Sequence, residues 1–205
     1  MDFDFDIMTE KEIEKIKNTI KVYKSRLAGE KKRFGGYFDN GGVRHKIPEL
    51  YIQLGDYKGA LTYFRWFEKE FPDDSCFPFF DLLWSFAYFK NKKEKDAIRL
   101  AYRTAFSNIY MIDLLCNKPI SFNDKSEPYD LGYAKELIEW CEKLLTKDFK
   151  IWICKLNETE DFKANINKFI SIQKLIDDES LGESRSHLLA ESKKLERGLT
   201  RREEE

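Results

Sequence analysis

The order of residues between Arg44 and Pro72 constrains the fold more than any other feature of this chain. An apolar run ends at Gly55-Asp56, which is typical of a helix end followed by a tight turn. Apolar side chains then recur at helical spacing: Ala60, Leu61, Phe64, Phe67 and Phe71. The pattern predicts two antiparallel helices joined by a short turn and ended by Pro72.

Pro48 sets an expected start for the first of these helices. Proline is tolerated best in the opening turn, where its missing N–H would have no helical partner. We therefore expect the helix to begin near His45 to Ile47.

A second copy of the pattern follows at an offset of 37 residues. The offset pairs Ile47 with Trp84, Tyr51 with Tyr88, Ala60 with Ala97, and Phe64 with Ala101. Several matches at one shared offset indicate an internal repeat of helical hairpins.

This pattern resembles the tetratricopeptide repeat (TPR), in which a small residue lets two helices approach closely. The residues that carry the resemblance are Tyr51, Gly55, Ala60, Phe64 and Pro72. Departures from the family pattern are Arg44, Pro48 and a period longer than the usual ~34 residues. The chain is similar to bacterial TPR-containing proteins of uncharacterised role. The resemblance implies an all-α fold of antiparallel hairpins stacked as a short α-α superhelix.

The rest of the chain also has helical periodicity. Thr9 and Glu12 form a capping-box pattern at the start of an amphipathic helix. We expect a single all-helical domain over residues 1–205. Its expected parts are an amino-terminal helix (9–33), two TPR-like hairpins (43–108), a degenerate third hairpin (128–156) and carboxy-terminal helices (159–198).

Charge and hydropathy exclude several classes of partner. The net charge is -1, and no apolar run approaches the ~18 residues of a membrane span. The segment Met1 to Asp6 is acidic, where a secretory signal has a basic start. We expect a cytoplasmic protein that binds neither nucleic acid nor membrane. The basic stretch Lys90 to Lys95, with Arg99 and Arg103, is interrupted by acids and is interpreted as a solvated helix start.

The cysteines and histidines indicate no catalytic or metal site. Cys76, Cys116, Cys141 and Cys154 are far apart and have apolar neighbours, so we expect buried, reduced thiols. His45 and His187 lie in no metal-ligand pattern. We expect no metal, no cofactor and no catalytic residues.

Four glycines between Gly35 and Gly42 indicate a loop. Closely spaced backbone amides after Lys31-Lys32-Arg33 would suit an anion, but the spacing does not match a phosphate-binding loop. We interpret the segment as a flexible connector.

These observations favour a non-catalytic protein–protein interaction module, such as an adaptor or scaffold, with a protein or peptide partner. The candidate partner-binding residues are His45, Lys46, Glu49 and Gln53, which lie opposite the apolar Leu50 and Leu54 on one helix. Two alternatives remain open. One is an immunity-type or inhibitor protein that binds one cognate bacterial enzyme, and the other is an enzyme with an unrecognised carboxylate site.

Overall fold

The structure is a computed structural model that describes residues 8–72, 74, 77–120 and 127–201. These residues form ten α-helices and no strand, which confirms the all-α fold class. The chain divides into two compact units, Met1–Asp74 and Ser75–Glu205. The organisation as a single domain stays a prediction. Among the described helices, none combines the length and the apolar character that a membrane span requires.

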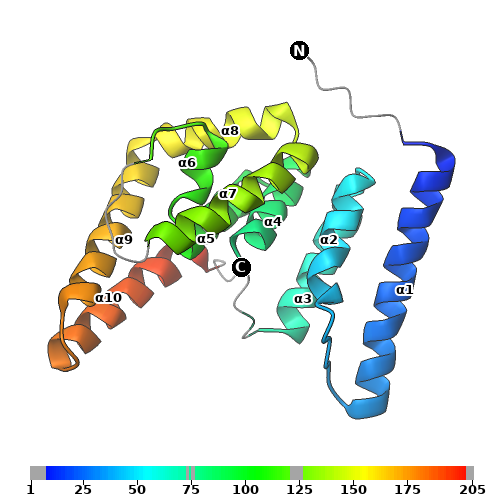
Figure 1. Cartoon of the computed structure of the whole chain (residues 1–205), viewed down its shortest axis with the longest axis horizontal. Helices are drawn as coiled ribbons and strands as arrows, with labels where there is room; N and C mark the ends of the chain where they lie inside the picture. Colours follow the sequence, from blue (N-terminus) through cyan, green and yellow to red (C-terminus); the bar gives the residue numbers. More distant parts are fainter. Residues whose placement is uncertain (1–7, 73, 75–76, 121–126, 202–205) are drawn as a thin grey trace. The chain divides into compact units, whose positions relative to one another are not determined.

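Unit 1 contains three helices, α1 (Glu10–Phe34), α2 (Val43–Gln53) and α3 (Tyr57–Glu70). α2 packs against both of the others (Figure 1). The core of the unit includes Leu27, Ile47 and Phe64, each at most 1% exposed. α1 and α3 are therefore held together mainly through α2.

The ends of α1 follow from local sequence. The side chain of Thr9 accepts a hydrogen bond from Glu12 N–H at 3.3 Å, and Glu12 Oε2 accepts one from Thr9 N–H at 2.8 Å. This confirms the predicted capping box. Gly35 ends the helix in the left-handed conformation (φ 73°), which suits glycine because it has no Cβ.

α2 begins at Val43, earlier than the start predicted from Pro48. The proline removes the N–H that would bond the carbonyl of Arg44, four residues before it. The hydroxyl of Tyr63 on α3 donates to that carbonyl instead, at 2.9 Å. The prediction was wrong because a side chain from the next helix supplies the missing donor.

Two glycines shape the junction of α2 and α3, Gly55 in the turn and Gly59 in the first turn of α3. Gly55 has φ 67°, a left-handed conformation. Asp56 caps α3 by accepting from Gly59 N–H at 2.8 Å. A Cβ on Gly59 would lie 2.7 Å from Cδ1 of Tyr51 and would also clash with the Asp56 carboxylate. The predicted helix–turn–helix is therefore present, with tight packing at the turn.

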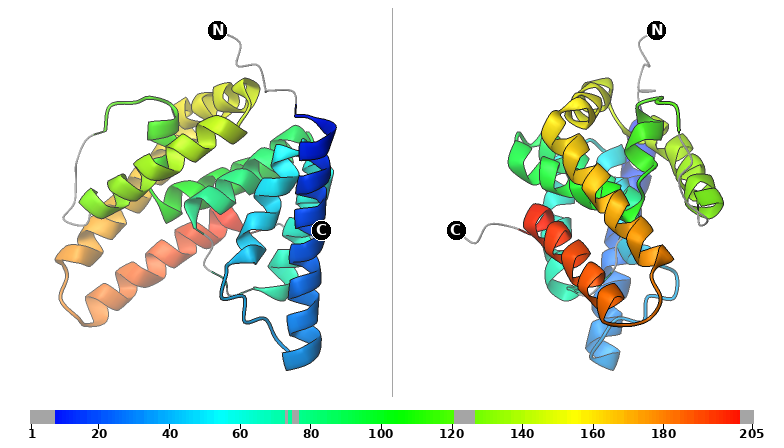
Figure 2. Two further views of the ribbon diagram at one scale, coloured as in Figure 1. Left: turned by 45° about the vertical axis from the view of Figure 1, so that its right-hand side comes forward. Right: turned by 90° about the vertical axis from the view of Figure 1, so that its left-hand side faces the viewer.

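Unit 2 contains the remaining described helices, and α5 lies in its middle. They are α4 (Pro78–Lys90), α5 (Glu94–Ser107), α6 (Met111–Leu115), α7 (Glu127–Leu144), α8 (Lys147–Glu158), α9 (Glu160–Asp178) and α10 (Glu183–Thr200). α5 contacts α4, α6, α9 and α10. α9 and α10 form a carboxy-terminal hairpin, which the two views of Figure 2 show from other sides. Every residue of α4 from Pro78 to Tyr88 is buried, as its nearly uninterrupted apolar sequence predicts.

The segment predicted as a third hairpin contains α7 and α8. Both helices pack against α6, the short helix before them, rather than mainly against each other. The carboxyl end of α6 is thereby placed beside α8.

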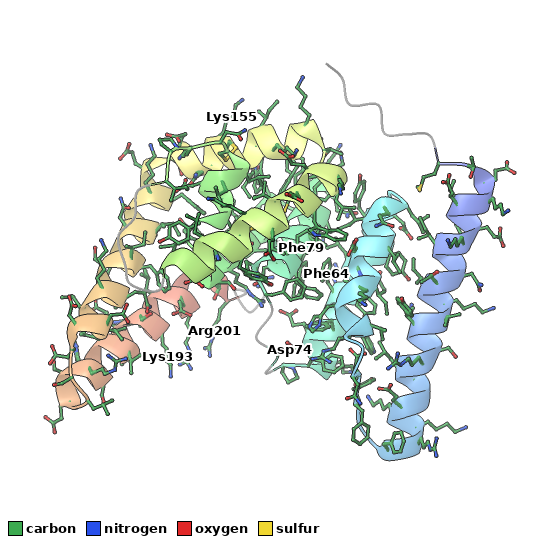
Figure 3. All side chains as sticks on the ribbon, in the orientation of Figure 1. Phe64, Asp74, Phe79, Lys155, Lys193 and Arg201 are labelled. Atoms are coloured by element: carbon green, nitrogen blue, oxygen red, sulfur yellow. A yellow bond between two sulfur atoms is a disulfide. The ribbon has the colours of Figure 1, made fainter. Side chains whose placement is uncertain are left out.

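Two of the four cysteines correct the expectation of reduced thiols. Cys116, at the carboxyl end of α6, forms a disulfide with Cys154 on α8, the neighbour of the Lys155 labelled in Figure 3. Their Cα atoms are 5.5 Å apart although 38 residues separate them in sequence. The prediction was wrong because only the packing of α8 on α6 brings them together. Cys141 is free and buried as expected, and Cys76 lies outside the described residues.

Both small residues of the predicted repeats are fully buried, Ala60 on α3 and Ala97 on α5 (each 0% exposed). Replacing either with Leu is expected to lower the free energy of unfolding by roughly 1 to 3 kcal/mol, because no space exists for the added atoms. Urea melts would measure the loss. Ala190→Leu on α10 is the matched control, since Ala190 is exposed and such changes stay within about 0.5 kcal/mol. If all three variants have the same free energy of unfolding, Ala60 and Ala97 are not tightly packed.

Candidate binding groove

Unit 1 contains an open groove of about 960 Å³, whose lining comes mainly from α1 and α3. This volume is at the upper end of the range for ligand pockets, ~300–1,000 Å³. Leu27, Tyr51 and Tyr63 contribute buried or half-buried side chains to its lining. Small residues, including Ala28 on α1 and Thr62 on α3, keep it open.

Helical spacing explains which residues of α1 line the groove. Lys24, Ala28 and Lys31 are four and three residues apart, so they share one face of α1, and Lys32 lies beside them. Nζ of Lys24 donates to the hydroxyl of Tyr51 at 3.4 Å. The α1 side therefore has positive charge beside an aromatic ring.

An aromatic cluster forms the end of the groove near the end of α3. The ring centroid of Trp66 lies 5.8 Å from that of Tyr37 and 5.0 Å from that of Tyr63. Tyr37 also packs on Phe71, with centroids 4.7 Å apart. Trp66 is half-buried, so part of its ring is available to a bound molecule.

An ion pair joins α1 to α3 at this end. Lys31 pairs with Glu70, and the Tyr37 hydroxyl donates to Oε2 of Glu70 at 3.0 Å. Hydrogen bonding from Lys31 lowers the pKa of Glu70, and the bond to Glu70 raises the pKa of Lys31. Both groups therefore stay charged at neutral pH.

The four residues predicted to bind a partner lie elsewhere on α2. Nε2 of His45 is 3.4 Å from Oδ2 of Asp74, which is labelled in Figure 3, and burial lowers the pKa of the imidazole. Gln53 donates to Oε1 of Glu49 at 3.2 Å, and burial raises the pKa of this carboxyl. Lys46 is exposed. The structure thus places His45, Glu49 and Gln53 in internal contacts and exposes only Lys46.

The groove and this predicted face lie on opposite sides of α2. At about 100° per residue, Tyr51 is about 180° around the helix from the midpoint of the four predicted residues. Sequence reasoning missed the groove because its walls come from α1 and α3, which are not consecutive. The available signal was the spacing of Lys24, Ala28 and Lys31 on α1.

The glycine-rich loop binds carboxylates of the chain itself. Glu30 accepts from the backbone N–H groups of Phe38 (3.1 Å) and Asp39 (2.9 Å). The buried Asp39 accepts from those of Val43 (2.8 Å) and Arg44 (3.1 Å). These amides already have anionic partners, which gives no support to a phosphate site.

Trp84 and the two arginines of the basic stretch do not form a binding surface in unit 2. Trp84 is 1% exposed and stacks on Tyr88, so no ligand can reach it. In the basic stretch, Arg99 is 8% exposed and Arg103 pairs with Asp81, so these two arginines form no continuous basic surface. Within the described ranges, no group of three or more His, Cys, Asp or Glu is placed to hold a metal ion.

Comparison of the chain with protein-family models, with curated proteins and with solved structures finds no match.

Proposed function

We propose that this protein is a non-catalytic, TPR-like interaction module that binds a segment of a partner protein in the groove of unit 1. The observation that carries the proposal is the lining of the groove. It combines partly exposed aromatic rings, Tyr51 and Trp66, with the lysines Lys24 and Lys32. Aromatic rings are enriched where proteins bind one another, and charged side chains at the edge of such a surface select the partner by its charge.

The TPR-like part of the proposal has support from two helix pairs. α2 and α3 are joined by the Gly55 turn and have Ala60 in their core. α4 and α5 form the most extensive helix pair of unit 2 and have Ala97 at the equivalent place. A helix pair with a small residue in its core at each of two places 37 residues apart supports the proposed repeat.

A peptide segment suits the groove better than a compact small molecule. The groove is open to solvent and runs between two helices, so a chain can enter and leave at its ends. Grooves between helices bind peptides through a few side-chain anchors along one face. Trp66 at one end and Lys24 nearer the middle of α1 provide two such contacts.

Blocking the groove tests the proposal. A photo-crosslinking residue at Thr62 of the full chain should yield one defined partner peptide by mass spectrometry, whereas the same residue at Ala190 on α10 should not. Ala28→Trp fills the groove and should lower that cross-link at least about tenfold, or ~1.4 kcal/mol of binding free energy. Ala190→Trp is the matched control, because Ala190 is an exposed alanine on a helix of unit 2.

The same cross-linking experiment also tests whether the partner binds another surface. If the cross-link persists in Ala28→Trp but disappears in Lys46→Glu with Glu49→Lys, the partner binds the originally predicted face of α2. If the identified partner is an enzyme and the complex is inactive, the module is an inhibitor rather than an adaptor.

A further inference from the structure

The α1 side of the groove carries three lysines, Lys24, Lys31 and Lys32, and no acid. The surrounding helix adds to this positive charge, because between residue 15 and residue 33 eight basic residues stand against the single acid Glu30. This local excess is hidden in the overall net charge of -1. A positive surface attracts a segment that carries carboxylates.

The acidic groups in the groove already have partners. Asp56 caps α3 through Gly59 N–H, and Glu70 binds Lys31 and Tyr37. In contrast, Lys32 makes no ion pair or hydrogen bond with any part of the chain that the structure describes. The groove therefore has positive charge to offer and little negative charge.

The chain contains one segment with matching chemistry. Residues 2–7, which lie outside the described residues, read Asp-Phe-Asp-Phe-Asp-Ile. In an extended chain successive side chains point to opposite sides, so the two phenylalanines and the isoleucine would share one side and the three aspartates the other. Such a segment presents aromatic rings to the groove's aromatic lining and carboxylates to the lysines at its rim.

We propose that the groove binds residues 2–7 of a second copy of this chain. This inference rests on the proposed function, because it names the occupant of the same groove. The spacing of charges fits: Lys24 and Lys32 are about 12 Å apart along α1. Asp2 and Asp6 are about 13 Å apart in an extended chain.

The segment cannot reach the aromatic end of its own groove. Lys31 lies about 32 Å along α1 from Glu10, at 1.5 Å per residue. The chain from Phe5 to Glu10 spans at most ~18 Å, and that from Phe3 at most ~25 Å. If residues 2–7 fill the groove as far as its aromatic end, they therefore come from another molecule.

Protein is favoured over nucleic acid for the same groove. A phosphate backbone places negative charge at every nucleotide, and it would lie against Asp56 and Glu70 as well as the lysines. Three carboxylates separated by aromatic residues can avoid those two positions.

The test uses the full chain and an acetylated, fluorescein-labelled peptide of residues 1–8. Fluorescence anisotropy should show saturable binding that weakens as salt increases. A peptide with all three aspartates replaced by asparagine should bind at least tenfold more weakly. The groove variant Lys24→Glu with Lys32→Glu should show the same loss. Its matched control, Lys193→Glu with Lys194→Glu on α10, should bind like the unaltered chain, since both lysines are exposed there.

Sedimentation equilibrium then tests whether the bound segment comes from a second copy of the chain. The full chain should self-associate, and either the groove variant or a chain with Asp2, Asp4 and Asp6 replaced by asparagine should do so at least tenfold more weakly. Mixing these two variants leaves one intact groove and one intact segment, so a one-to-one complex should return.

Three results would overturn the inference. They are equal binding of the asparagine peptide, no recovery of a complex on mixing, and displacement of the peptide by a single-stranded oligonucleotide at equal concentration. If the peptide fails while the cross-link from Thr62 still identifies another protein, the occupant is wrong and the proposed function stands. If both fail, the groove is not a protein-binding site.

Discussion

Removing the bond between Cys116 and Cys154 is expected to lower the free energy of unfolding by roughly 4 kcal/mol, because the bond closes a loop of 38 residues in the unfolded chain. The loop begins directly after α6 and includes all of α7 and most of α8. Urea melts of Cys116→Ala with Cys154→Ala would measure the loss. Thiol reduction of the unaltered chain should give a melt close to that of the double variant.

Cys141→Ala separates this effect from the loss of a buried sulfur. Cys141 is free and fully buried, so its variant loses packing but should keep its sensitivity to reduction. A double variant that melts like the unaltered chain, in reducing and non-reducing buffer alike, would contradict the expected effect.

The disulfide indicates an oxidising compartment, whereas the sequence predicted a cytoplasmic location, where thiols stay reduced. Structural disulfides persist in oxidising compartments and are rare where glutathione keeps thiols reduced. Lysing cells directly into denaturant that contains an alkylating reagent would show which state Cys116 and Cys154 have in the cell. Alkylation of both cysteines favours the cytoplasm, and alkylation of neither until a reductant is added favours an oxidising compartment.

The second large effect is a dependence of stability on pH that comes from Asp81 on α4. The carboxyl group is buried, and burial raises its pKa to about 6, although Arg103 (3.1 Å away) and Arg99 act in the opposite direction. Its ordinary value is 3.8. Between these two values the folded chain keeps a proton that the unfolded chain releases. The stability that Asp81 contributes is therefore complete below about pH 4 and is lost as pH rises through 6.

Asp81→Asn removes this titration and keeps the shape of the side chain. The stability of the unaltered chain minus that of the variant should fall by about 2 to 3 kcal/mol between pH 4 and pH 7. Denaturant melts at four pH values would measure it. Asp178→Asn, at an exposed position on α9, is the control for the loss of one carboxyl. If the difference in unfolding free energy between the unaltered chain and Asp81→Asn stays constant or rises with pH, Arg103 keeps Asp81 ionised.

Local signals predicted the parts of the fold that depend on neighbours in sequence. The cap of α1 needs only Thr9 and Glu12, and the turn before α3 needs only Gly55 and Asp56. The start of α2 was not predictable in this way. Asp39 binds the first amides of that helix from four residues upstream, and Tyr63 bonds the carbonyl that Pro48 leaves without its usual donor.

The groove needed information that sequence patterns do not contain. Periodicity shows that Lys24 and Lys31 share a face of α1, but it does not show what lies opposite. The opposite side comes from α3, which reaches that position because both helices pack on α2. The disulfide shows the same limit, because the contact between α6 and α8 is what places its two cysteines together.

The carboxylate-bound loop between α1 and α2 makes the groove preorganised. Glu30 holds the backbone at Phe38 and Asp39, and Asp39 in turn holds the start of α2. One wall and part of the lining therefore keep their geometry before anything binds. Most of the conformational entropy lost on binding then comes from the ligand, at about 0.5 to 1.5 kcal/mol for each immobilised side chain. Stiffening a bound segment, by a ring closure or by proline, should therefore raise its affinity more than stiffening the protein.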